Sequence, residues 1–173
     1  MELINGLLYL VVFYKFGLTW ITLQGFILVS TLLVVSFIDM DHRIIPNKIV
    51  LFLMIVSIPL NFLVSNLTWL EMLWGFLVGG GLLLVIALLS RGGMGGGDIK
   101  LMAALGLYLG WQQILMAIFI ASLIGSIVGI FLMLFFGKGR KTAIPFGPFL
   151  AIGTLVCYLW SDQLINWYIG NVI

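Results

Sequence analysis

The sequence predicts an all-α integral membrane protein that crosses the bilayer with six to seven helices. Apolar residues make up 63% of its 173 residues and charged residues only 8%, against about 25% charged in a soluble domain. A soluble chain of about this length buries only about 70% of its extended surface, so too much apolar surface would meet water. One spanning helix takes about 20 residues, which leaves room for six or seven spans and short loops. The sequence lacks the alternating segments of a membrane barrel.

Seven apolar segments follow one another along the chain, and each is predicted to form a helix. The first is short, and it lacks the basic region and small-residue cleavage site of a signal peptide. The fifth is also short, and it crosses a hydrocarbon core of about 30 Å only if it borrows flanking turns. The predicted segments cover residues 2–16, 20–38, 47–64, 69–89, 99–110, 111–136 and 146–168.

The segment ends carry residues that suit the ends of membrane helices. The Ile45-Pro46 pair ends the second helical stretch, and Pro46 or Asn47 begins the third. Tryptophans accumulate at membrane interfaces, and five lie near predicted segment ends: Trp20, Trp69, Trp111, Trp160 and Trp167.

The basic residues lie almost entirely in alternate loops. Lysine and arginine accumulate in cytoplasmic loops, so we expect a cytoplasmic N-terminus and an external C-terminus. Without the fifth segment, the loop before the last segment would fall on the opposite side and the bias would be lost. The bases on the predicted cytoplasmic face are Arg43, Lys48, Arg91, Lys100, Lys138, Arg140 and Lys141, and Lys15 falls on the other. They form no basic stripe, so no nucleic acid partner is expected.

Asp39 follows directly on the apolar run of the second segment, in the stretch FIDMDHRIIPN. An ionised carboxylate is costly beside such a run, so a solvated turn explains Asp39 poorly. A solvated turn explains Asp41, His42 and Arg43 better. On a helix, the Asp39 and Asp41 side chains would point about 200° apart, so the two acids would face different surroundings. We therefore expect Asp39 to be the functional acid of this stretch.

A glycine run precedes Asp98 in the stretch SRGGMGGGDIKLMAALG. Glycine disfavours helices and allows close approach of another segment, so we expect an irregular backbone that contacts protein or a wet cavity. Asp98 then begins the next helix, where capping its free amides is the structural alternative to a functional role. No Gly-Lys-Ser/Thr follows, which excludes a P-loop, and no strand supports a dinucleotide site.

Asp39 and Asp98 are predicted to lie at one depth, because both fall at cytoplasmic ends of spans. Two close carboxylates in a low-dielectric site do not ionise together readily. One can therefore act as base and the other as acid around a water molecule, which is the chemistry of aspartic proteases. This chemistry needs no metal or other cofactor, and the chain has only one histidine, His42, and one cysteine, Cys157.

Three stretches form a specific pattern, in a fixed order, over most of the chain. Residues 39–47 fit D-x-[DEK]-x-x-x-[IL]-P-[DN], and residues 95–98 fit G-x-G-D, followed by IKLMAALG. The segment AIPFGPFLAIG, from Ala143 to Gly153, resembles a PFGP-type segment. Together these motifs resemble those of the type IV prepilin leader peptidases, which are GxGD-class aspartyl proteases. The resemblance implies a single membrane-embedded peptidase domain over residues 1–173.

The resemblance implies that Asp39 and Asp98 are the catalytic aspartates. It also implies supporting or substrate-binding roles for Asp41, Pro46, Gly95, Gly97 and Lys100. Lys100 would hold the glycine-rich loop or tune the Asp98 carboxylate. The alternative is that Lys100 only anchors the chain at the membrane interface.

The family's substrates and location are likewise implied by the resemblance. Family members remove a short basic leader, after a glycine and before a hydrophobic helix, at the cytoplasmic face of the bacterial inner membrane. The expected partners are therefore a prepilin or pseudopilin and membrane lipid, in type IV pilus assembly or type II secretion.

One departure from the family pattern concerns cysteine. Many bacterial members carry a cytoplasmic domain with two Cys-x-x-Cys pairs, which accompanies N-methylation with S-adenosylmethionine. Here Cys157 stands alone, and MELINGLLYL resembles the region after that domain. We therefore expect no methyltransferase activity, whether the chain is a natural short form or a truncated one.

Other membrane proteins also use paired carboxylates. Presenilin-like proteases carry a PAL motif and a tyrosine beside the first aspartate, but here Ile38 precedes Asp39 and the last motif reads IPFGP. A proton-coupled transporter or channel would use broken helices and inverted repeats, and no internal repeat is evident. A membrane scaffold would leave the positions of the two acids unexplained.

Overall fold

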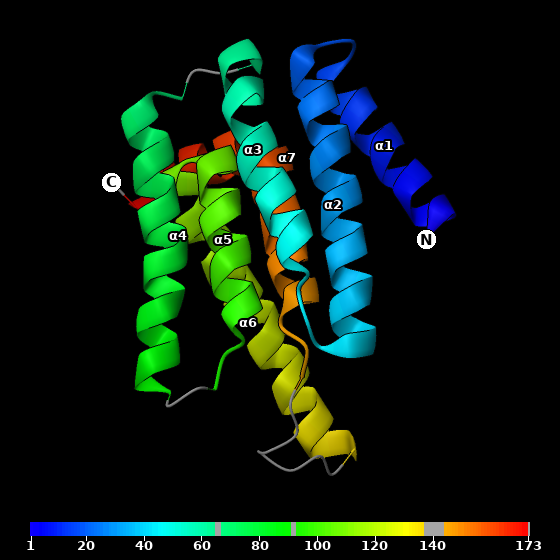
Figure 1. Cartoon of the computed structure of the whole chain (residues 1–173), viewed down its shortest axis with the longest axis vertical. Coiled ribbons are helices and arrows are strands. Elements are labelled where there is room, and N and C mark those ends of the chain that lie inside the picture. Colours follow the sequence, from blue (N-terminus) through cyan, green and yellow to red (C-terminus); the bar gives the residue numbers. More distant parts are fainter. Residues whose placement is uncertain (65–66, 91–92, 137–143, 173) are drawn as a thin grey trace.

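The computed structural model has seven helices in the part of the chain that it describes, which is residues 1–64, 67–90, 93–136 and 144–172 (side chains of 136, 162 and 164–172 excepted). The all-α prediction is confirmed, and Figure 1 shows the helices as a bundle. Their bounds are α1 Glu2–Phe16, α2 Trp20–His42, α3 Asn47–Val64, α4 Trp69–Leu89, α5 Gly96–Leu109, α6 Trp111–Phe136 and α7 Gly147–Val172, with non-helical backbone angles at Trp160 inside α7.

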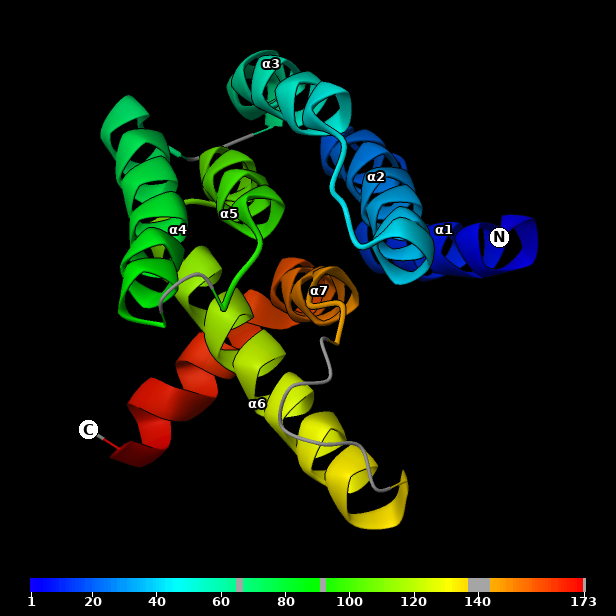
Figure 2. The ribbon, with the colours of Figure 1, turned by 60° about the horizontal axis from the view of Figure 1, so that its bottom comes forward.

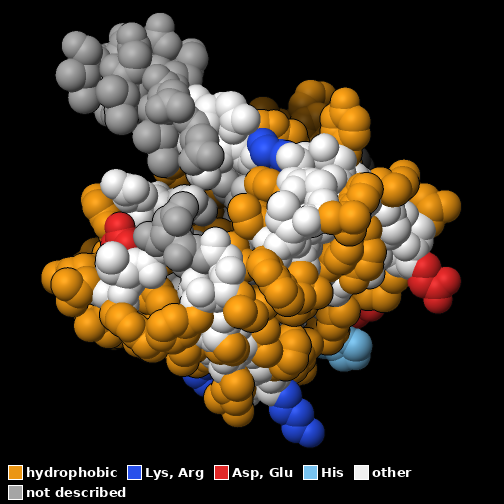
Figure 3. Space-filling view, turned by 90° about the horizontal axis from the view of Figure 1, so that it is seen from above, with side chains coloured by type: hydrophobic (Ala, Val, Ile, Leu, Met, Phe, Trp, Pro, Cys, Tyr) orange, Lys and Arg blue, Asp and Glu red, His pale blue; other side chains and the backbone are white. Residues whose placement is uncertain are grey.

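Length and composition identify the membrane spans. α2, α3, α4 and α6 are each long and apolar enough to cross a bilayer, and Gly147–Ser161 of α7 form a shorter apolar helix. α5 has 14 residues, or about 21 Å at 1.5 Å per residue, so it does not cross a core of about 30 Å by itself. The space-filling view in Figure 3 shows apolar side chains over most of the face seen from above. The protein is therefore a multi-pass membrane protein.

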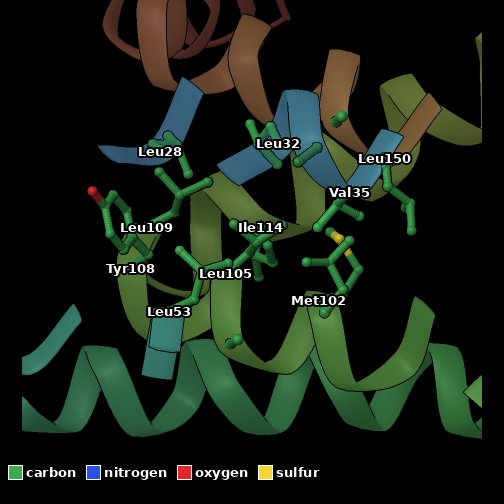
Figure 4. Close-up of a cluster of buried hydrophobic side chains, with 14 of the residues drawn as sticks. Leu28, Leu32, Val35, Leu53, Met102, Leu105, Tyr108, Leu109, Ile114 and Leu150 are labelled. Atoms are coloured by element: carbon green, nitrogen blue, oxygen red, sulfur yellow. The ribbon is translucent and has the colours of Figure 1, made fainter. Parts of the chain in front are cut away.

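α5 lies inside the bundle rather than against lipid. It packs against α3, α4, α6 and α7, and most of its residues from Leu101 to Leu109 are buried. Figure 4 shows Met102, Leu105 and Tyr108 within the main buried cluster. Because α5 carries Asp98 at its start, this packing fixes the position of that residue.

Glycines bring the backbones of α4 and α5 into direct contact. A Cβ on Gly75 would collide with the carbonyl of Gly106, and one on Gly79 would collide with the carbonyl of Met102. Small residues four positions apart allow such close approach between membrane helices. This contact sets the height of α5 relative to α4.

A buried polar network joins α2, α3 and α5. The Gln24 side chain donates to the Asn61 Oδ1 atom at 3.3 Å, and the Asn61 amide donates to the Leu107 carbonyl at 2.8 Å. The Tyr108 hydroxyl donates to the Gln24 carbonyl. Buried polar groups are costly without partners in a membrane, so this network favours one arrangement of the three helices.

Successive helices run in alternating directions. The ends of α2, α4 and α6 and the starts of α3, α5 and α7 lie toward the lower end of the bundle in Figure 1. Arg43, Lys48 and Lys100 belong to this end, whereas Lys15 is in the last turn of α1 at the other. The other predicted loop bases, Arg91, Lys138, Arg140 and Lys141, lie outside the described residues, as does Ala143 of the third motif, and the side chain of Trp167 is not described.

Most helix boundaries agree with the sequence prediction, and three do not. α2 continues past Ile38 to His42, where Arg43 adopts a left-handed conformation (φ 56°) and donates its N–H to the Asp39 carbonyl at 2.9 Å. α5 begins at Gly96 rather than at Ile99. α7 runs four residues beyond the predicted end, to Val172. The first two differences fall at the two aspartates.

Candidate active site

The last turn of α2 separates two neighbouring acids. Asp39 is 6% exposed, whereas Asp41 is exposed to solvent. The helix therefore directs these side chains apart, as the spacing predicts. Among the described side chains, Asp39 and Asp98 are the only charged ones that are buried.

Asp98 occupies the third position of α5 and is 8% exposed. The alternative that Asp98 is the N-cap is wrong, because Gly95 occupies that position. The carboxylate instead accepts a hydrogen bond from the Gly95 backbone N–H. This bond satisfies a free amide and stabilises the first turn of the helix.

The glycine run is only partly irregular. The expectation of a non-helical backbone is wrong for Gly96 and Gly97, which begin α5. A first turn tolerates glycine because its N–H groups have no partner within the helix, and the Asp98 side chain supports the turn. Gly92 lies outside the described residues.

Two of the three glycines before Asp98 face close neighbours. A Cβ on Gly97 would lie 2.9 Å from the Ile45 Cβ atom, and one on Gly95 would lie 3.1 Å from an Asp98 carboxylate oxygen. A Cβ on Gly96 would meet nothing within 4 Å. The G-x-G-D spacing therefore has a steric basis here, since the first and third positions are crowded and the second is open.

The start of α7 reaches the Asp39 carboxylate. The Gly147 backbone N–H donates to the Asp39 Oδ2 atom at 2.8 Å, and the contact is buried. Figure 2, which brings the lower end forward, shows α7 between α2 and α6. The third motif thus meets the first motif directly.

The two carboxylates interact electrostatically. Asp98 lies outside the spanning helices, in the first turn of α5. Burial raises the pKa of Asp98 to about 6, the Asp39 charge adds to this effect, and the Gly95 hydrogen bond opposes it. Asp98 therefore holds a proton more readily than an exposed aspartate does.

The other predicted site residues have structural contacts at the same end of the bundle. The Lys100 ammonium donates to the Asn47 Oδ1 atom at 3.1 Å, which connects α5 to the start of α3. The Pro46 carbonyl accepts the N–H groups of Ile49 and Val50 and so begins α3. The described residues contain no group of three histidine, cysteine, aspartate or glutamate side chains that could hold a metal ion.

Sequence reasoning missed two features of the site. It noted the motif around Gly147 but gave this glycine no role, because its partner is 108 positions away in the sequence. It also passed over Gly75 and Gly79, whose four-residue spacing on an apolar helix is a usable signal for close packing.

A match to a family model covers the part of the chain that carries both acids. The model describes the type IV leader peptidase family, and it matches residues 26–130. The chain belongs to the type IV leader peptidase family. Asp39, Gly95, Gly97 and Asp98 all fall within the matched residues, whereas Gly147 falls beyond them.

Relatives within the type IV leader peptidase family resemble nearly the whole chain. The prepilin leader peptidase/N-methyltransferase of Legionella pneumophila is 35% identical over 98% of this chain and 61% of its own length. The protein of the same description from Aeromonas salmonicida is 35% identical over 99% of this chain and 61% of its own. The Bacillus subtilis relative is 32% identical over 97% of this chain and 68% of its own length.

The chain spans about three fifths of the length of the Legionella and Aeromonas relatives. No solved structure matches the chain.

Proposed function

We propose that this protein is an aspartic endopeptidase of the bacterial inner membrane. Its substrates are type IV prepilins or pilin-like precursors, from which it removes the short leader. The observation that carries the proposal is a pair of buried carboxylates, Asp39 and Asp98, supplied by two helices, α2 and α5, at the same end of a membrane bundle. Family membership and the printed descriptions of the relatives support this reading.

The proposed reaction uses both carboxyl groups and one water molecule. The ionised carboxylate takes a proton from water as the water oxygen bonds to the scissile carbonyl carbon, and the protonated carboxyl donates its proton to the carbonyl oxygen. The C–N bond then breaks. The amine nitrogen leaves with the proton held by the first carboxyl, and a hydroxyl of the former carbonyl carbon returns a proton to the second.

The remaining motif residues support this arrangement in the proposal. Gly97 lets α5 approach Ile45, and the Gly95 N–H donates to the Asp98 carboxylate, so both glycines place the second aspartate. Lys100 and Pro46 support the start of α3, next to the end of α2.

We propose that the N-terminus and the site face the cytoplasm, and that residues 1–173 act as one membrane-embedded peptidase domain. The bias of basic residues toward the end of the bundle that carries Asp39 and Asp98 supports this orientation.

The test is cleavage of a synthetic prepilin precursor by the purified protein, with the new N-terminus measured by mass spectrometry. Asp39→Asn and Asp98→Asn should each abolish cleavage while the protein still accumulates in the membrane. Asp41→Asn is the matched control and should retain activity, because Asp41 is exposed. Cleavage by both Asn variants would refute the assignment. Proton flux in proteoliposomes without cleavage would favour a transporter, and the product mass reports any methyl group.

A further inference from the structure

The first turn of α7 presents one free backbone donor to the first aspartate. The Gly147 N–H donates to the Asp39 Oδ2 atom at 2.8 Å. Pro148 has no N–H, and the N–H groups of Phe149 and Leu150 both bond the Phe146 carbonyl. The sequence of this turn therefore directs a single amide at the carboxylate.

The contact requires glycine at position 147. A Cβ there would lie 2.7 Å from Asp39 Oδ2, 3.0 Å from Cγ and 3.1 Å from Cβ. Both residues are buried, so the carboxylate has little room to move aside. Any side chain would push the carboxylate away from its donor.

The environments of the two aspartates are unequal. The N-terminus of a helix carries partial positive charge, and a hydrogen bond from a backbone N–H is stronger to an ionised carboxylate than to a neutral one. Asp39 receives both effects from α7. Asp98 also accepts a backbone N–H, but its burial and the neighbouring Asp39 charge outweigh that bond.

We propose, on the basis of the proposed peptidase function, that Gly147 is a positioning residue whose N–H holds the Asp39 carboxylate in place as the water-activating base. Asp98 is then the acid that protonates the scissile carbonyl oxygen. The PFGP segment acts through Asp39 and does not touch the reacting atoms.

The other described charges near this end are exposed, so solvent screens them. The described first turn of α7, from Gly147 to Leu150, contains no ionisable side chain. Apart from Asp98, the charged or titratable side chains at this end of α1, α2, α3 and α5 are Glu2, Asp41, His42, Arg43, Lys48 and Lys100, all exposed.

The first test compares Gly147→Ala with Gly81→Ala in the purified full chain. Gly147→Ala should lower kcat by roughly 10- to 100-fold, the size expected for a lost hydrogen bond to a charged group. KM should change less. A Cβ on Gly81 would meet nothing within 4 Å, so Gly81→Ala should match the parent protein. An unchanged kcat in Gly147→Ala, or a change confined to KM, would overturn the proposal.

The second test needs neither cleavage nor a folded Gly147 variant. Infrared difference spectra recorded during a pH titration report the C=O stretch of a protonated carboxylic acid. The band of the buried acid should disappear in Asp98→Asn and persist in Asp39→Asn, where it should titrate at lower pH because the Asp39 charge is gone. Loss of the band in Asp39→Asn instead would reverse the assignment. Because this readout is independent of substrate, it separates failure of the inference from failure of the proposed function.

Discussion

Gly96 and Gly97 are adjacent, yet only Gly97 faces a close neighbour. A Cβ on Gly97 would lie 2.9 Å from the Cβ atom of Ile45 and 3.3 Å from its backbone nitrogen. Ile45 is buried beside the start of α3 and has little freedom to shift. The spacing of the motif therefore places α5 against the loop after α2.

Gly97→Ala should lower both activity and stability. Overpacking at a tight contact costs typically about 1 to 3 kcal/mol, and here it would also move Asp98 away from Asp39. Gly96→Ala should leave thermal stability unchanged or slightly raised, because the added methyl meets nothing and glycine is a poor helix former. Thermal unfolding in detergent and the cleavage rate measure both variants. Equal behaviour of the two would show that the contact with Ile45 is not required.

Activity should depend on the protonation of Asp98. Its pKa is raised to about 6, so the acid form is lost as the pH rises through about 6. The basic limb of kcat/KM should fall in that range, with an apparent pKa that belongs to the pair. A pH profile of the wild type and of Asp41→Asn tests this expectation. The two profiles should coincide, since Asp41 is exposed, and a basic limb that moves in Asp41→Asn would contradict it.

The raised pKa of Asp98 also makes the stability of the folded protein depend on pH. Because folding raises the pKa of Asp98 above its ordinary value of 3.8, the folded protein binds more protons between about pH 4 and 6. Its contribution to stability is present below this window and is lost as the pH rises through about 6.

At the level of helices, α4 and α5 form the tightest pair. Gly75 and Gly79 lie on one face of α4, against the backbone of α5 at Gly106 and Met102. Backbone atoms cannot rotate away as a side chain can, so this face tolerates no added methyl group.

Gly79→Ala should destabilise the bundle, and Gly81→Ala should not. The added Cβ at position 79 would collide with the Met102 carbonyl, whereas at position 81 it would meet open space. We expect a loss of about 1 to 3 kcal/mol for the first variant and a neutral effect or a gain of up to about 1 kcal/mol for the second. Chemical unfolding in detergent compares them, and equal stabilities would rule out close packing of α4 on α5.

A helix boundary could be predicted from the sequence where the signals that fix it are local. The ends of α1, α3, α4 and α6 follow local signals, such as the N-cap Thr68 and its capping-box partner Glu71 before α4, and these ends match the prediction. The end of α2 depends on Arg43 in a left-handed conformation, and the start of α5 depends on Asp98 reaching back to Gly95. Those contacts are not visible in apolar patterning, so both boundaries were placed incorrectly.

The candidate site likewise combines residues that the sequence predicts with a contact that it does not predict. Asp39 and Asp98 stand out in the sequence because charge is scarce, and the structure buries both. The bond from Gly147 to Asp39 joins residues 108 positions apart. Only the packing of α7 on α2 brings them together, so no local pattern could predict that contact.

At the scale of the whole molecule, the helix ends define two opposite faces. Cys157 is buried, so a Cys157→Ser background allows single cysteines to report these faces. Ile44→Cys follows α2, and Leu18→Cys lies between α1 and α2 at the other end; both native side chains are exposed. A membrane-impermeant maleimide should label position 44 only from the cytoplasmic side and position 18 only from outside. The reverse pattern would invert the proposed orientation and place the aspartates outside the cell.

The place of α7 in the chain also sets an order of events during synthesis. Both aspartates leave the ribosome well before Gly147, which follows Asp39 by 108 residues. A nascent chain that has inserted only through α6 therefore holds two acids, but the amide that orients the first of them has not arrived. On the proposed function, the active site is therefore completed only after Gly147 has been synthesised.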